Sequence, residues 1–432
     1  MRYGPTLALC VLLSAFSLPQ IACAQDFTLL GGDLTSDLKG RNSIQLPAPN
    51  ISKDERRLRQ ISGFDVFHNL FSEKKGLGPQ FNNRSCGSCH VNNGRGPVGF
   101  SDETAFGNAM VVRVSLKGKD KDGSPKDVPG IGEELLEQTL KNNSRFEILL
   151  SWKNLNRKYP DGTKYTLRSP ILKFRLNTRS KVFHTLLMTP PLIGVGLLDA
   201  VSEDTILQAS DPLDLNRDGI SGRPNLVPDK RKEGKSIGRF GFKASEPSLE
   251  QQSAAALFRD IGISNSLFNK GPVEISDDEL DRLLVYQAIA GVPKARDQVS
   301  PEVQQGYSLF LKSGCQSCHL PTLTTTNTKD ERANQVIHPF TDLLLHDMGQ
   351  GLASLRGEYD ATGSEWKTAP LWGVGYGRQI SRVEQRFLHD GRARTLEEAI
   401  VWHDGEARGA RRKFMQLSAE DRARLIRFLD SL

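Results

Sequence analysis

Apolar residues at three- and four-residue spacing mark two similar helices in this chain. The repeated positions are Ile61, Phe64, Phe67 and Phe71 in the first helix and Val303, Tyr307 and Phe310 in the second. This spacing is typical of helices with one buried face. Residues 63–67 and 306–310 also share the order glycine, aromatic, any residue, aliphatic, phenylalanine. The pattern therefore predicts an internal duplication.

A second match follows further along each copy. Phe242 lies six residues before Ser248, and His389 lies six residues before Thr395. Each of these hydroxyl residues precedes a leucine and a glutamate, an order typical of a helix N-terminus after a loop. Both copies are thus expected to contain a loop followed by a helix.

The region from about 113 to 240 has a different character. Residues 117–130 are rich in Lys, Asp, Gly and Pro, as loops are. Alternating apolar and polar residues at 165–167 and 173–176 indicate a few strands. We interpret the region as a mixed loop and strand insertion in the first copy.

Composition narrows the classes of function. The 57 Lys and Arg residues against 51 Asp and Glu give a net charge of +6, with both signs interspersed. Nucleic-acid-binding proteins usually concentrate their basic residues. We interpret the one basic run, at 408–413, as a solvated face and expect no nucleic-acid partner. No apolar run beyond residue 25 reaches the roughly 20 residues that cross a bilayer, so no membrane span is expected.

The first 24 residues have the features of a secretory signal peptide. Arg2 supplies a positive charge, residues 7–18 form an apolar core, and Ala22-Cys23-Ala24 offers a cleavage site. We therefore expect export to the periplasm and cleavage after Ala24. A lipid anchor on Cys23 is less favoured, because Gln20 stands where that signal prefers leucine.

The four cysteines that remain form two pairs, and each pair precedes a histidine: Cys86, Cys89 and His90, and then Cys315, Cys318 and His319. This is the attachment signature of c-type haem, in which both thiols form thioethers and the histidine binds iron. Redox cysteine pairs and zinc sites use similar residues. Two copies that use every mature cysteine favour two covalently bound haem groups.

These features predict a mainly α protein with two cytochrome c-like helical haem domains. We expect the first domain at 25–295, with the mixed insertion at about 113–240 inside it. The second haem domain is expected at 296–432, after a connection near Gly291.

The sixth iron ligand decides between electron transfer and chemistry at a haem. His403 lies 14 residues after His389, whereas the same interval after Phe242 leads to Ala256. A methyl group cannot bind iron, so we expect His403 as distal ligand of the second haem and an open first haem. The rival ligands in the sequence are His346 and Met348 for the second haem and Met110 for the first.

Asp214, Asn216 and Asp218, followed by Gly219, resemble the start of a calcium loop. The twelfth position is Asn225 instead of the glutamate of an EF-hand. Bound Ca²⁺ is one interpretation, and a solvated polar turn is the other.

Several segments resemble the bacterial di-haem cytochrome c peroxidase superfamily, and most closely its branch of di-haem oxidoreductases. The segments are 76–96, 191–200, 211–225, 238–252, 340–349 and 387–407. The resemblance covers the chain from about residue 60 to its C-terminus.

The resemblance implies different roles for the two haems. In the family the C-terminal haem receives electrons, and His403 stands at the place of its distal ligand. The N-terminal haem is the peroxidatic one, beside a glutamine and a glutamate. Gln252 matches the glutamine, and Asp260 is the acid nearest to the glutamate position at Gly262. Phe242 takes the position of a tryptophan between the haems.

The sequence thus predicts an exported di-haem oxidoreductase of peroxidase type. Hydrogen peroxide or another small oxidant would react at the N-terminal haem, with Gln252 and Asp260 as catalytic candidates. Electrons would come from a soluble donor, such as a small cytochrome or a cupredoxin. The alternative is a di-haem electron carrier that serves a partner oxidase, reductase or metal-uptake system. A haem-based sensor or assembly factor is the least favoured class.

Overall fold

A computed structural model describes residues 25–96, 109–141, 146–381 and 384–432. The predicted signal peptide lies outside these residues. The α-helices are α1 Asn42–Gln45, α2 Asp54–His68, α3 Cys86–Cys89, α4 Val195–Asp199, α5 Glu203–Gln208, α6 Leu249–Ala256, α7 Asp277–Ala288, α8 Pro301–Ser313, α9 Gly377–Ser381, α10 Leu396–Trp402, α11 Arg408–Gln416 and α12 Ala419–Ser431.

The described strands pair into seven sheets of two strands each. Only β1 Thr35–Ser36 and β10 Val292–Pro293 are parallel. The antiparallel pairs are β2 Gln80–Phe81 with β4 Gln138–Thr139, β3 Met110–Ser115 with β7 Phe183–Met188, β5 Ile148–Lys158 with β6 Lys164–Phe174, β8 Leu226–Pro228 with β9 Lys235–Ile237, β11 Leu323–Thr324 with β12 Val336–Ile337, and β13 Leu345–Asp347 with β14 Glu365–Lys367.

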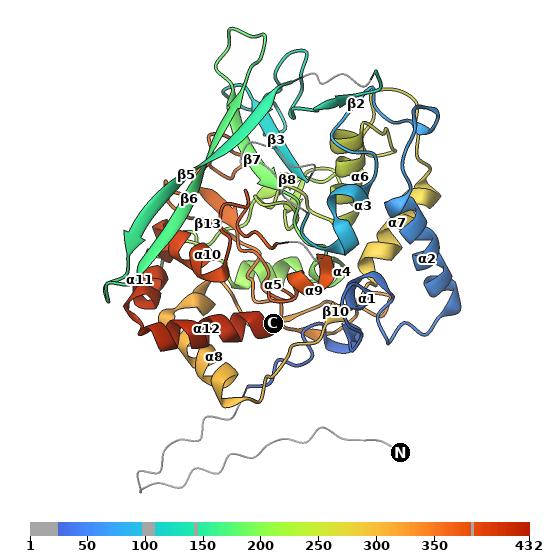
Figure 1. Ribbon diagram of the computed structural model, residues 1–432. Helices are drawn as coiled ribbons and strands as arrows, with labels where there is room; N and C mark the ends of the chain where they lie inside the picture. The colour runs from blue at the N-terminus through green and yellow to red at the C-terminus, as the bar shows by residue number, and fades with distance from the viewer. Residues whose placement is uncertain (1–24, 97–108, 142–145, 382–383) are drawn as a thin grey trace, which may run out of the picture.

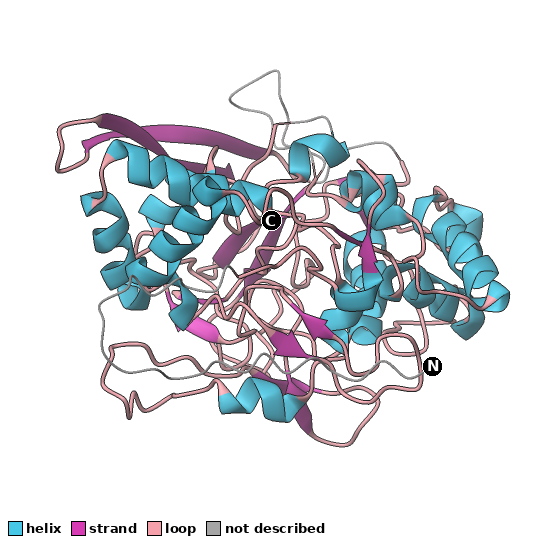
Figure 2. Ribbon diagram, turned by 90° about the horizontal axis from the view of Figure 1, so that it is seen from below, coloured by secondary structure: helices cyan, strands magenta, loops and turns pink. Residues whose placement is uncertain are grey.

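The prediction of a mainly α fold is therefore wrong. The long connections between the helices form turns and short paired strands. These segments are too short to show a clear periodicity in the sequence, so they were not predicted from it. Figure 2 shows this division, with helices gathered at two ends of the molecule and strands and loops between them. In both ribbon views α2 and α7 lie at one end, and α8, α11 and α12 lie at the other.

Glycine allows the same close helix crossing at each end. A Cβ at Gly63 of α2 would lie 1.9 Å from the Arg282 carbonyl oxygen of α7. A Cβ at Gly306 of α8 would lie 2.1 Å from the Arg424 carbonyl oxygen of α12. Only a residue without a side chain permits such contacts. The shared sequence pattern thus marks two equivalent helix pairs.

The second internal match also has a structural counterpart. Residues 240 and 246 form an isolated antiparallel bridge before α6, and residues 387 and 393 form one before α10. The Ser248 hydroxyl then accepts the Gln251 N–H at 3.2 Å, and the Thr395 hydroxyl accepts the Glu398 N–H at 3.0 Å. Both predicted helix starts are confirmed.

The insertion contains a long β5–β6 hairpin that reaches across the molecule to α11 (Figure 1). The strands expected at 165–167 and 173–176 belong to one strand, β6, which ends at Phe174. At the hairpin tip the Tyr159 hydroxyl donates to Glu397 at 2.8 Å, and Arg422 pairs with Asp161 at 2.8 Å. The hairpin of the first copy thereby contacts helices α10 and α12 of the second copy.

The largest apolar core joins residues from both predicted domains. Phe27 and Leu34, from the beginning of the described chain, are buried together with Phe310 of α8 and Phe428 of α12. This core contains residues from both sides of position 295 and so does not mark a boundary there. The domain boundaries stay a prediction. Among the described helices, none has the length and apolar content that a bilayer crossing requires.

Candidate haem sites

The first motif folds so that both thiols come from a single helical turn. Cys86 and Cys89 form the ends of α3, which begins with a hydrogen bond from the Ser88 N–H to the Ser85 hydroxyl at 3.1 Å. The two cysteines are not joined by a disulfide. His90 follows directly, and its Nδ1 donates to the Pro190 carbonyl oxygen at 2.9 Å.

The second motif repeats this arrangement. Cys315 begins a 3₁₀ turn that ends before Cys318, and both thiols are free. The Nδ1 atom of His319 donates to the Phe340 carbonyl oxygen at 2.9 Å. Burial lowers the pKa of both His90 and His319 to about 4, so each imidazole is neutral.

This donor set fits haem c at both places. A neutral histidine whose Nδ1–H is held by a carbonyl keeps the lone pair on Nε2 for a metal. Paired thiols on one turn, without a disulfide, are what thioether attachment requires. The described residues therefore support His90 and His319 as proximal ligands next to their cysteine pairs.

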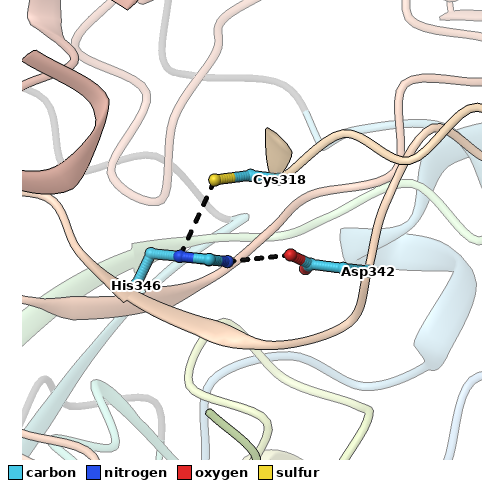
Figure 3. Close-up of side chains that lie close together, drawn as sticks. All are labelled: Cys318, Asp342 and His346. Atoms are coloured by element: carbon cyan, nitrogen blue, oxygen red, sulfur yellow. Dashed lines mark hydrogen bonds and ion pairs between the residues drawn. The ribbon is translucent and has the colours of Figure 1, made fainter. Parts of the chain in front are cut away.

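His346 has no nitrogen free for iron (Figure 3). Its Nε2–H donates to Asp342 at 2.8 Å, and its Nδ1–H donates to Glu406 at 2.7 Å. Burial would lower the pKa of His346, but the hydrogen bonds to Asp342, Cys318 and Glu406 raise it to about 12. A charged imidazole is no ligand, so these contacts argue against His346 as the rival ligand.

Cys318, Asp342 and His346 also form the one group of three or more metal-type ligands found among the described residues. The Cys318 sulfur lies 3.7 Å from Nδ1 of His346. If Cys318 carries haem, its sulfur is a thioether and the group is an ion-pair cluster at the haem edge. A separate metal is not needed to explain it.

His403 has the free nitrogen that His346 lacks. It follows α10, which ends at Trp402, and is the C-cap residue of that helix. Its Nδ1 donates to the Ala399 carbonyl oxygen at 2.7 Å, so Nε2 is available. Burial lowers its pKa, and it lies close enough to His319 to lower the pKa of that histidine too. Its role as distal ligand stays a prediction.

The other two rival ligands are both packed against apolar side chains. Met348 contacts the largest core and belongs to the segment beside Asp404 and Gly405. Met110 is buried in the core of the β3–β7 sheet.

One face of α6 carries the residues predicted for the first haem. Gln252, Ala256 and Asp260 are spaced by four and are partly exposed, whereas Gln251, Ser253, Ala254, Ala255 and Leu257 are buried. The helix does not end after Ala256 but continues through a π-helical turn, Leu257–Ile261. Asp260 therefore lies four residues, about one turn, beyond Ala256 and on the same face.

Asp260 forms an acid pair with Glu134, which sequence reasoning missed. The Asn82 side-chain amide donates to Glu134, and the Asn82 N–H donates to the Asp260 carbonyl oxygen at 2.7 Å. The two carboxyl groups are within hydrogen-bonding reach, and both act electrostatically on the Cys89 thiol. Burial and the Asp260 charge hold the pKa of Glu134 well above its usual range. The one hint of this acid pair in the sequence is that two glutamates are adjacent at positions 133 and 134.

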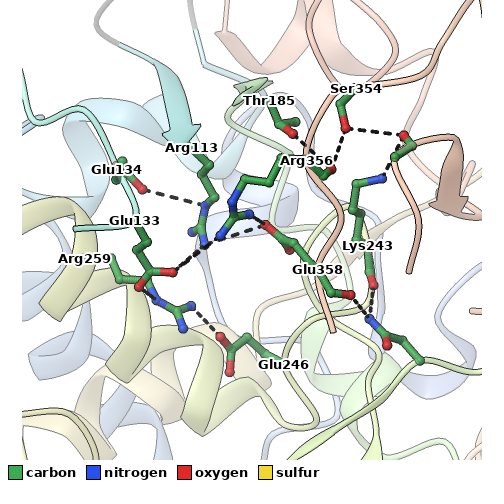
Figure 4. Close-up of polar contacts among 12 residues, drawn as sticks. Arg113, Glu133, Glu134, Thr185, Lys243, Glu246, Arg259, Ser354, Arg356 and Glu358 are labelled. Atoms are coloured by element: carbon green, nitrogen blue, oxygen red, sulfur yellow. Dashed lines mark hydrogen bonds and ion pairs between the residues drawn. The ribbon is translucent and has the colours of Figure 1, made fainter. Parts of the chain in front are cut away.

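The surrounding charges explain why this pair keeps a proton (Figure 4). Arg259 pairs with Glu133 at 2.7 Å and also with Glu246. Glu134 is left with Arg113, whose Nε lies 3.7 Å away. One buried oxygen of Glu134 has no donor among the described residues. The raised pKa of Glu134 favours its neutral form, which costs less than a carboxylate to bury without a donor.

A polar cavity of about 180 Å³ leads from the surface toward this network. Its lining includes the exposed Asp120 and Asp122 as well as Glu133, Arg259 and Tyr359. Because the lining is charged at both ends, the cavity suits water and small polar solutes.

An aromatic stack lies between the two sites. The rings of Trp366 and His389 are parallel within 11° and their centroids are 3.7 Å apart. Lys243 covers the Trp366 ring, with Nζ 3.7 Å from the ring centroid. Trp366 is also the direct cross-strand partner of His346 in the β13–β14 pair, so the stack adjoins the second motif.

Backbone hydrogen bonds connect the stack to the first motif. The His389 carbonyl oxygen accepts the Met188 N–H at 2.7 Å. Two residues on, the Pro190 carbonyl oxygen accepts from His90. The Lys367 N–H donates to the Phe242 carbonyl oxygen at 2.8 Å, so Trp366 stands beside the phenylalanine that was expected to replace a tryptophan.

The calcium-like loop uses its oxygens on its own backbone. The Asp214 carboxylate accepts the Gly219 N–H at 3.2 Å, and the Asn216 side-chain oxygen accepts the Asp218 N–H at 2.9 Å. Asn225 is buried and donates to the Lys243 and Glu358 carbonyl oxygens instead of facing the loop. Calcium binding at Asp214, Asn216 and Asp218 stays a prediction.

The duplicated motifs agree with a comparison to known families. A search of curated proteins found no match. The family described as "di-haem oxidoreductase, putative peroxidase" matches residues 25–274 and 269–432, and its name implies two haem groups. The chain belongs to this di-haem oxidoreductase family.

Proposed function

We propose that this protein is an exported, periplasmic di-haem c-type cytochrome with peroxidase-like activity. It takes electrons from a soluble donor at the C-terminal haem and reduces hydrogen peroxide or another small oxidant at the N-terminal haem. Both haems are covalently bound, through the cysteine pairs 86/89 and 315/318. The family supports this proposal, as do two pairs of cysteines without a disulfide, each followed by a histidine held by a backbone carbonyl.

The difference between positions 256 and 403 carries the proposal. When bound, the haem supplies the iron that holds peroxide and the electrons that reduce it. By the internal match, Ala256 would offer the first haem no donor atom, whereas His403 would offer the second haem its free Nε2. Oxidant chemistry therefore belongs to the first haem and electron transfer to the second.

The chain supplies protons beside the open position. Peroxide needs two electrons and two protons to become two water molecules. Glu134 holds one proton against Asp260, on the same helix face as Ala256, and can deliver it to the departing oxygen. Gln252, one turn away, can donate an amide hydrogen bond to the bound oxidant. The polar cavity resupplies protons from the solvent.

The stack of Trp366 and His389 is the proposed connection for electrons between the haems. It adjoins Cys318 through His346 and adjoins His90 through the segment Met188–Pro190. Close packing without gaps favours electron transfer through these groups. Burial lowers the pKa of Lys243 to about 7. In its protonated form Lys243 lies over Trp366 and disfavours a tryptophan radical cation.

An Ala256→His variant tests the proposal. The new imidazole should bind the first haem and abolish peroxide consumption, measured with ascorbate and a small redox dye as reductant. Ala256→Ser is the matched control. Serine is only one oxygen larger than alanine and offers no imidazole, so this variant should retain activity. If the parent consumes no peroxide, or if Ala256→His is as active as the parent, the peroxidase proposal is wrong and the electron-carrier function remains.

A further inference from the structure

The tip of the β5–β6 hairpin and helix α11 together form a basic surface. We define it as residues 157–164 and 408–413. These fourteen residues include seven Lys or Arg and one acid, Asp161. Their excess of six equals the net charge of the entire chain, so the rest of the protein is neutral on balance. The sequence alone gave no reason to combine two runs so far apart.

The two halves of the basic surface lie side by side. Figure 1 shows the hairpin tip beside α11. Burial raises the pKa of Tyr165, and the positive charges of Arg157 and Arg411 both act against that rise, so both guanidinium groups lie close to its hydroxyl. The surface is therefore continuous across the hairpin and the helix.

Most of its charge is not neutralised within the chain. Asp161 already pairs with Arg422 at 2.8 Å, and Asp404 pairs with Arg408 at 2.6 Å. In contrast, no carboxylate of the described residues lies within 4.0 Å of four exposed cations, which are Lys158, Lys164, Arg412 and Lys413. Unpaired cations at one place create a positive potential that attracts anionic groups.

The basic surface lies next to the second haem motif. The charge of Arg411 acts on His403 and lowers its pKa. Lys413 acts on the Cys315 thiol, and its Nζ lies 3.8 Å from the position of a Cβ on Gly314. Helix α11 thus places positive charge beside both the distal histidine and a haem-attaching cysteine.

We propose that this basic surface docks a small acidic redox protein that reduces the second haem. The inference rests on the proposed function, in which electrons enter at that haem. In the step, the donor metal loses one electron and the second haem gains one, and no proton or atom is transferred. Opposite charges speed the encounter and orient the donor toward the haem edge.

A protein partner fits this surface better than a membrane. Interfacial membrane binding combines basic residues with apolar side chains that enter the bilayer. None of the large, exposed apolar side chains in the described part of the chain belongs to residues 157–164 or 408–413. Helix α11 also lies beside the second haem motif, which is where a donor must approach.

Charge reversal in the full holoprotein tests the proposal. The variant is Lys158→Glu/Lys164→Glu/Arg412→Glu, and the control is Lys53→Glu/Lys74→Glu/Lys75→Glu, three exposed lysines around α2 at the other end of the molecule. Two quantities are measured with an acidic cupredoxin: its affinity in the oxidised form by calorimetry, and the second-order rate at which its reduced form reduces the second haem.

We expect the variant to lose about tenfold to a hundredfold in rate at low salt, with weaker binding, whereas the control matches the parent. A basic cupredoxin should show no such loss. Equal rates for parent and variant, or a slower control, would overturn the proposal. It is also overturned if only sedimentation with phosphatidylglycerol vesicles responds to the variant, because the surface would then bind lipid.

The same proteins separate this inference from the proposed function. Peroxide consumption driven by ascorbate and a small dye bypasses the docking surface. If that activity is present while charge reversal changes nothing, docking is wrong and the peroxidase proposal stands. If that activity is absent while charge reversal slows reduction, docking stands and the protein is an electron carrier.

Discussion

The two regions that carry the haem motifs share one scaffold and differ at the end of one helix. Each has a glycine-mediated helix crossing, a pair of cysteines with an anchored histidine, and a loop that leads into a capped helix. In the first region that helix continues past Ala256 into a π-helical turn. In the second it ends at Trp402, and His403 is its C-cap.

The comparison teaches that the end of one helix can set the role of a haem. Where the helix stops, the C-cap residue is His403, the proposed ligand of the second haem. Where it continues, the same position holds a methyl group, and the next turn brings Asp260 to Glu134. The end of the helix thus decides whether a histidine follows at position 403 or the chain continues from Ala256 to Asp260, and each change below tests one side of this difference.

Glu134→Gln should have the largest effect. The amide cannot deliver a proton, so peroxide turnover should fall by about 10²–10⁴-fold. The raised pKa means that above pH 4.5 the folded protein keeps a proton that the unfolded chain releases, so the stability due to this group decreases as pH rises toward the folded pKa. Gln removes that dependence, and thermal unfolding at pH 5 and pH 8 checks it. Normal turnover with altered unfolding would make Glu134 purely structural.

Gly63→Val and Gly306→Val test whether the scaffold is shared. Each new side chain would meet a backbone oxygen of the facing helix, so the helices must separate. We expect each variant to lose about 3 kcal/mol of unfolding free energy, at the upper end of overpacking effects. Denaturant unfolding of the holoprotein measures it. A loss in one variant only would mean that the two helix pairs are not equivalent.

His403→Met should raise the potential of the second haem, because a thioether favours ferrous iron. The shift should be on the order of 100 mV in a spectroelectrochemical titration, and the haem should remain low-spin. His403→Ala should make it high-spin. His346→Gln and Met348→Leu are the controls, and neither should change the spin state. If one of them does and His403→Ala does not, the ligand assignment is wrong.

Gly409→Ala should have the smallest effect. It should raise the free energy of unfolding, whereas the valine variants of Gly63 and Gly306 lower it. Gly409 lies in α11, and a Cβ there would have no atom within 4 Å. Alanine should therefore stabilise the protein by up to about 1 kcal/mol through helix propensity alone. Because α11 belongs to the basic surface, unchanged reduction by the acidic cupredoxin would show that added rigidity does not alter docking.

Local signals in the sequence were sufficient for the motifs and the helix starts. The C-x-x-C-H motifs and the Ser248 and Thr395 caps depend on neighbours within a few residues, so spacing alone reveals them. The glycine pattern at 63 and 306 was also visible, although its reason, a crossing helix, was not.

Contacts between distant segments could not be read from the sequence. Glu134 meets Asp260 only because the insertion folds back on the end of α6, and Trp366 of β14 stacks on His389, which lies in the loop before α10. The mainly α prediction failed for a related reason. Strands of two or three residues carry too little periodicity to be distinguished from loops.

Electron paramagnetic resonance of the half-reduced holoprotein, with and without cyanide, tests the central claim most directly. The account predicts one ferric haem with a high-spin signal that cyanide converts to low-spin, since position 256 offers no ligand. The second haem should be unaffected by cyanide. If both haems are low-spin and inert to cyanide in the resting and half-reduced protein, the first haem has a sixth ligand and the difference between the two regions does not exist.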